Sequence, residues 1–166
     1  MRALAVTDQF VPRGPFEPPW LIWARGELGV KEVPGPGSDP RVEWYHGATA
    51  AGPATDNVAW CSSFLCRAFE EQGLTDHPRS KSSQAWRSWG TGVGPIAGAV
   101  CVLSYGGARG HVGLVVGRLL SGLVPLLGGN TSDSVAIRAF PVTHVVGYRW
   151  PRAPLIDEPG AARATR

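Results

Sequence analysis

The chain lacks any long hydrophobic run, since no stretch of its 166 residues approaches the ~18 consecutive apolar residues of a membrane-spanning helix. The first residues carry one early arginine but no apolar segment of signal-peptide length, so we expect synthesis in the cytoplasm without a readable export signal. Charge is also scarce: charged residues make up 17% of the chain, and no run of Lys or Arg stands out. A formal charge of +3 without such a run argues against a nucleic-acid partner.

Cysteine is rare as well. The three cysteines, Cys61, Cys66 and Cys101, are an odd number without the spacing of a disulfide framework, which excludes a disulfide scaffold. A zinc site built on Cys61, Cys66 and a histidine would rest on C-x₄-C without a second pair of ligands. We therefore expect no metal and no cofactor, and interpret Cys66 and Cys101 as buried packing residues.

The length fits one domain of ordinary size. Residues 1–17 are predicted to form an N-terminal arm that ends in the proline-rich FEPPW, and residues 152–166 a loose tail rich in Pro, Gly and Ala. Between them, residues 18–151 contain no repeat and no internal linker. We expect a single domain there.

The pattern of apolar residues changes at Gly98. Before it, the spacing predicts helices over residues 19–28, after Asp39, from Trp60 to near Gly73, and over 82–89. After it come short β-branched runs separated by turn residues: AVCVLS, HVGLVVG, LVPLLG, VAIRAF and HVVGYR. Helices followed by strands indicate an α+β fold, with the helices on one face of an antiparallel meander sheet.

Cys61 in DNVAWCSSF is the first candidate for chemistry. It falls in the first turn of a predicted helix, where unpaired backbone N–H groups and the helix dipole lower the pKa of a thiol. It also falls on the apolar stripe of that helix, where a small buried cysteine would simply pack. Position alone leaves both interpretations open.

A thiol nucleophile needs a base, and His111 is the best placed histidine. It opens a strong strand directly after the glycine-rich YGGARG, a rigid mount beside a loop-lined cleft. His46 and His77 lie in polar, loop-like context and are interpreted as surface residues, and His144 opens a late strand. A histidine at a strand end is otherwise most often structural.

The third member of a Cys–His site holds the imidazole by its other nitrogen. In LLGGN, Asn130 ends the strand after His111, with Asp133 close behind as the alternative. Gly128 and Gly129 would let the backbone approach closely there. The tripeptide GGN is also an ordinary turn sequence, so this assignment rests on the order Cys, His, amide along the chain.

Several segments occur together in one order: ARGELGVKEVPGPGSDPRVEWY, DNVAWCSSFLCRAFEEQGL, SQAWRSWG, GHVGLVVG, LLGGNTSDSV and VVGYRWP. As a set they resemble the papain-like peptidoglycan hydrolases of the NlpC and CHAP superfamily, and more closely the branch seen in phage lysins and bacterial wall enzymes. The likeness spans residues 20–151. It departs at Gly98-Ala99-Val100-Cys101, where the family usually has a Gly-Asp step.

The resemblance implies a papain-like fold and a bacteriolytic cysteine hydrolase that cleaves an amide bond of peptidoglycan, as endopeptidase or amidase. Carried over, Cys61 is the nucleophile, His111 the general base and Asn130 the third residue. The oxyanion hole would use the backbone N–H of Cys61, and Asp56 and Trp60 would line the site. The implied enzyme is a monomer that acts on the cell wall, in the periplasm or outside.

Trp44 and Tyr45 lie near a Pro/Gly-rich loop and are candidates to stack on a sugar ring. Trp20, Trp23, Trp86 and Trp89 lie on predicted helices and are interpreted as packing residues. Two other functions stay open: a papain-like hydrolase or acyltransferase acting on a non-wall amide or thioester, and a catalytically idle wall-binding domain. The order of Cys61, His111 and Asn130 argues against the idle domain.

Overall fold

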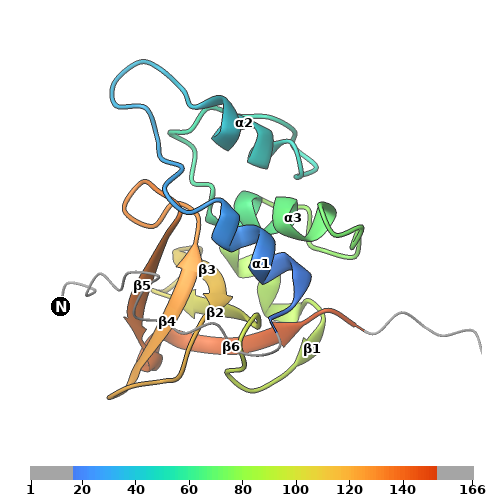
Figure 1. Cartoon of the computed structure of the whole chain (residues 1–166), viewed down its shortest axis with the longest axis vertical. Coiled ribbons are helices and arrows are strands. Elements are labelled where there is room, and N and C mark those ends of the chain that lie inside the picture. The colour runs from blue at the N-terminus through green and yellow to red at the C-terminus, as the bar shows by residue number, and fades with distance from the viewer. Residues whose placement is uncertain (1–16, 153–166) are drawn as a thin grey trace, which may run out of the picture.

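A computed structural model describes residues 17–152 of the chain and confirms an α+β fold (Figure 1). The three α-helices lie together on one side of a curved sheet (Figure 1). The elements in chain order are α1 (Pro19–Gly26), α2 (Pro40–His46), α3 (Cys61–Glu70), the 3₁₀ helix η2 (Ser83–Ser88), β1 (Thr91–Gly92), β2 (Val100–Ser104), β3 (Gly110–Val115), β4 (Leu123–Gly128), β5 (Ala136–Pro141), the 3₁₀ helix η3 (Val142–His144) and β6 (Val145–Trp150).

The helices begin where the sequence predicts. Proline occupies the start of both α1 and α2, where its missing N–H costs no hydrogen bond. The side chain of Asp39 caps α2 by accepting from the backbone N–H groups of Arg41 and Val42. The segment at 82–89 is helical as expected, but it is a 3₁₀ turn.

The sheet is antiparallel and six-stranded, in the order β1-β6-β2-β3-β4-β5. The meander prediction holds from β2 to β5 and is wrong for the last strand. β6 crosses back to pair with β2, where Cys101 lies opposite Tyr148, and the two-residue β1 was not predicted at all. Strand spacing in a sequence does not say to which edge the last strand returns.

A separate hydrophobic cluster packs against each face of the sheet. Val100 and Val102 of β2 point into the larger cluster under the helices, whereas Cys101 and Leu103 point into a smaller one on the opposite face. Because both faces are covered, the strands are apolar at successive positions. Cys66 and Cys101 are fully buried, as expected, each in a different cluster.

The last residue of the predicted arm contacts α1. Glu17, assigned to the arm, makes a buried ion pair with Arg25 of α1 at 2.7 Å. The rest of the arm, and the tail from residue 153, lie outside the described residues. Within residues 17–152, no helix is long and apolar enough to cross a membrane.

Candidate active site

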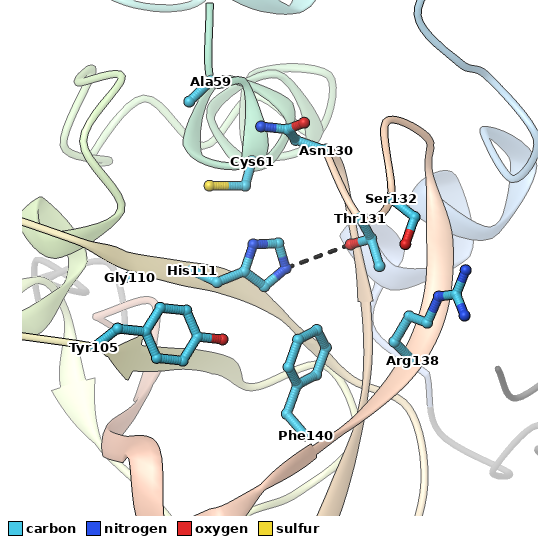
Figure 2. Close-up of a pocket in the computed structure, with 10 residues that line it drawn as sticks. All are labelled: Ala59, Cys61, Tyr105, Gly110, His111, Asn130, Thr131, Ser132, Arg138 and Phe140. Carbon is cyan, nitrogen blue, oxygen red and sulfur yellow. Dashed lines mark hydrogen bonds between the residues drawn. The ribbon is translucent and has the colours of Figure 1, made fainter. Parts of the chain in front are cut away.

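Cys61 is the first residue of α3 and lines a pocket of about 600 Å³ together with His111 (Figure 2). Trp60 is the N-cap residue of α3, and its side chain accepts no hydrogen bond from the first backbone N–H groups of the helix. Trp60 is itself fully buried, and its indole N–H donates to Glu32 at 2.7 Å. This anchor fixes where α3 begins, and therefore where the thiol lies.

His111 is the second residue of β3, paired with Leu103 of β2. The ring of Phe140 stacks on the imidazole with centroids 5.2 Å apart, which restricts how the imidazole can turn. Figure 2 shows Nδ1 of the ring facing Cys61 and Nε2 facing Thr131. The two nitrogens therefore face different side chains.

Thr131 supplies the hydrogen bond on Nε2, with Oγ1 at 3.4 Å. The same hydroxyl donates to the carbonyl of Gly128 at 3.2 Å, so its oxygen is free to accept from Nε2–H. With the proton on Nε2, the lone pair of Nδ1 faces the thiol. That is the tautomer a base for Cys61 requires.

Asn130, the residue expected to orient His111, lines the pocket but makes no hydrogen bond to the imidazole among the described residues. The neighbouring Thr131 makes that contact instead. The alternative, Asp133, is exposed and does not line this pocket. Asn130 and Asp133 both have positive φ, so successive side chains of the turn point in different directions. The sequence does not reveal which of these side chains faces the ring.

The two glycines before Asn130 allow close approach, as expected. A Cβ on Gly128 would lie 3.2 Å from Nε2 of His111. A Cβ on Gly129 would lie 2.6 Å from Cβ of Phe64 on α3. The turn can therefore sit directly against both the imidazole and the first turns of the helix.

Burial determines the charge states of the pair. Burial raises the pKa of the Cys61 thiol to about 11, although backbone hydrogen bonds from Val112, Ser62 and Cys61 itself act in the opposite direction. Burial lowers the pKa of His111 to about 4. The low thiol pKa expected from the helix start is thus overridden by burial. At neutral pH the resting pair is a neutral thiol beside a neutral imidazole.

Asp56 and Trp60 do not line the pocket. The buried carboxylate of Asp56 accepts from the backbone N–H groups of Val33 (2.8 Å) and Asp39 (2.9 Å), and so holds the Pro/Gly-rich loop between them. Trp60 is enclosed, with its ring stacked on Tyr45. Both residues act on the site indirectly, because their contacts hold in place the segments that lead into α3.

Trp44 and Tyr45 are also absent from this pocket. Tyr45 is fully buried and its hydroxyl donates to Glu27. The half-buried ring of Trp44 already contacts the guanidinium groups of Arg41 and Arg67, at 4.2 and 4.3 Å. On a short helix the sequence did not distinguish aromatic residues that pack from those that bind.

Seven of the described lining residues were not singled out from the sequence, among them the larger side chains of Tyr105, Thr131, Arg138 and Phe140. Two of them had a readable signal. Arg138 and Phe140 alternate with the buried Ile137 and Ala139 on β5, so they share the opposite face of that strand. An arginine on an otherwise apolar strand indicates a polar site, as a histidine at a strand start does.

Two histidines interpreted as surface residues are buried. His46 is enclosed, with Nδ1 2.8 Å from the hydroxyl of Ser63, and burial lowers its pKa. His77 is buried with Nε2 3.3 Å from Glu70, and burial likewise lowers its pKa. Polar neighbours in the sequence did not reveal that both rings turn inward. Neither lines the pocket of Cys61.

The comparisons with known proteins leave the site to be interpreted from its chemistry. No protein-family model matches the chain, and no curated protein matches it in sequence. Within residues 17–152, no group of three or more His, Cys, Asp or Glu side chains is arranged to hold a metal ion. The chemistry of the site therefore rests on Cys61, His111 and Thr131.

Proposed function

We propose that the protein is a papain-like cysteine hydrolase that cleaves an amide bond in the peptide part of peptidoglycan. The observation that carries the proposal is the arrangement of Cys61 at the start of α3, the imidazole of His111 facing it, and Thr131 on the far nitrogen (Figure 2). A nucleophile, a base and an orienting group in this order are the parts that acyl transfer needs. The wall as substrate rests on the resemblance described above.

The neutral resting pair sets how the reaction begins. Nδ1 of His111 takes the proton of the Cys61 thiol as sulfur attacks the carbonyl carbon, and the C–S bond forms. The tetrahedral oxyanion is held by backbone N–H groups at the start of α3, including that of Cys61. Nδ1 then gives its proton to the leaving amine as the C–N bond breaks, which leaves a thioester on Cys61.

Water completes the cycle. His111 removes a proton from the water that attacks the thioester, and the thiol leaves with a proton from the imidazole. The Thr131 hydroxyl accepts from Nε2–H throughout, so the ring keeps its orientation while its charge changes. Burial favours the neutral imidazole, so the imidazolium exists only while the charged intermediate does.

Release of soluble fragments from purified walls tests the proposal. Cys61→Ala removes the nucleophile and should abolish release, with a loss of at least about a thousandfold. Cys66→Ala is the matched control, because Cys66 is buried on the same helix and does not line the pocket. Equal release by a folded Cys61→Ala protein would contradict the proposal.

A further inference from the structure

We infer that Arg138 binds a carboxylate of the substrate beside the scissile amide, which makes the preferred substrate an anionic peptide. The inference rests on the proposed function for the reaction at Cys61, but not for the carboxylate site itself. Among the described residues that line the pocket, Arg138 is the one Lys or Arg, and none is Asp or Glu. This part of the pocket wall therefore carries a positive charge without a counter-charge of its own.

Strand register places Arg138 on the same side of the sheet as the catalytic imidazole. Arg138 pairs with Leu126 of β4, and Leu126 pairs with Val115 of β3. Val115 and His111 are four residues apart on one strand, so they face the same way. Phe140, two residues from Arg138, stacks on His111. Figure 2 shows Arg138 below the turn that carries Thr131 and Ser132.

The guanidinium group has no partner within the described part of the chain. Its Nε is buried and makes no hydrogen bond, and the side chain forms no ion pair with residues 17–152. A buried donor left unpaired is costly, so a site of this kind is completed by a ligand that accepts from it. A carboxylate matches the planar guanidinium by two parallel hydrogen bonds.

The charge of the surrounding sheet favours an anion as well. Residues 91–152 contain five arginines and a single acidic residue, Asp133. Asp133 is exposed and does not line the pocket. A cleft lined by one sign of charge concentrates ligands of the opposite sign. In a wall peptide, this selects a stem with a free carboxylate over the same stem with a carboxamide.

Alkylation of Cys61 tests the carboxylate site without assuming a substrate. Iodoacetate and iodoacetamide differ in a carboxylate against a carboxamide, and each loses iodide as sulfur forms the C–S bond and the thiol proton leaves to solvent. We expect the iodoacetate-to-iodoacetamide rate ratio at Cys61 to fall about tenfold in Arg138→Gln, the low end of focusing in a charged cleft. Mass mapping of the modified peptide reports Cys61 alone.

Two variants serve as controls. Arg138→Lys keeps the charge and should keep most of the iodoacetate preference. If the Arg138→Gln protein folds poorly, the ratio measured on Arg138→Lys still tests the inference. Arg118→Gln removes an exposed charge from the β3–β4 connection, at the end of β3 opposite His111, and should leave the ratio unchanged. An unchanged ratio in folded Arg138→Gln, or an equal fall in Arg118→Gln, would overturn the inference.

Turnover of paired wall peptides separates this inference from the proposed function. With a free-carboxylate stem and its amidated form, Arg138→Gln should lower kcat/KM about tenfold on the former and little on the latter. Equal turnover of both stems by wild type and Arg138→Gln overturns the inference and leaves the proposed function standing. No turnover by wild type, with the alkylation preference lost in Arg138→Gln, contradicts the proposed function and supports the carboxylate site.

Discussion

Gly129 lies where the turn that carries Thr131 packs against the start of α3. Replacing Gly129 with alanine should push the turn and the helix apart. The new Cβ would lie 2.6 Å from Cβ of Phe64 and 2.7 Å from Cε3 and Cζ3 of Trp60, whereas carbon atoms normally pack ~3.5–4.0 Å apart. Both neighbours are fully buried and cannot rotate away. Relief therefore needs the turn and α3 to move apart by roughly 1 Å.

Overpacking of this kind costs about 2–3 kcal/mol of folding free energy. In urea unfolding followed by tryptophan fluorescence, that loss lowers the midpoint by about 1 M when the slope is ~2–3 kcal/mol per molar. Gly94→Ala is the control, because a Cβ there meets open space and its φ is not positive; its free energy of unfolding should change by less than ~0.5 kcal/mol. Equal midpoints for the two variants would refute the reasoning.

Two further predictions concern His111. Thr131→Val removes the hydroxyl on Nε2 and should lower kcat about three- to tenfold with little change in KM, since a neutral hydrogen bond is worth about 0.5–1.5 kcal/mol. Thr131→Ser keeps the hydroxyl and should keep the rate; an equal loss in both variants would mean that Thr131 only packs. The second prediction concerns acid stability. The pKa of His111 is lowered to about 4 in the folded protein, so the unfolded chain binds the extra proton between about pH 6.5 and 4. Stability should be undiminished above about pH 6.5 and fall by up to about 3 kcal/mol toward pH 4, and His111→Gln should flatten that fall in pH-dependent urea unfolding. An identical fall in both proteins would contradict the burial argument.

The helices and the central strands could be predicted because their signals are local. Asp39 caps α2, and Cys61, Phe64, Leu65, Ala68 and Phe69 give α3 its buried stripe. The return of β6 to the edge of β2 could not be predicted, because it depends on which side chains cover the second cluster. That information is spread over the whole sheet.

The sequence predicted Cys61 and His111 as a candidate pair, and the structure places them in one pocket with Thr131, the neighbour of Asn130, on the imidazole. Cys61 and His111 lie at the start of a helix and of a strand, and both positions have a sequence pattern. Whether Asn130 or Thr131 faces the imidazole depends on backbone dihedrals that adjacent residues share, and Asn130 has φ of 52°. Burial also reversed the expected shift of the thiol pKa, and the depth of a pocket is a tertiary property.

The central claim is that Cys61 cleaves an amide bond of the wall, and mass spectrometry of digested peptidoglycan tests it most directly. Walls of several chemotypes are incubated with wild type, Cys61→Ala and Cys66→Ala. We predict pairs of fragments whose summed mass exceeds that of the parent by one water, one with a new carboxylate and the other with a new free amine, from wild type and Cys66→Ala only. New reducing sugar ends, or the same fragments from folded Cys61→Ala protein, would contradict the account.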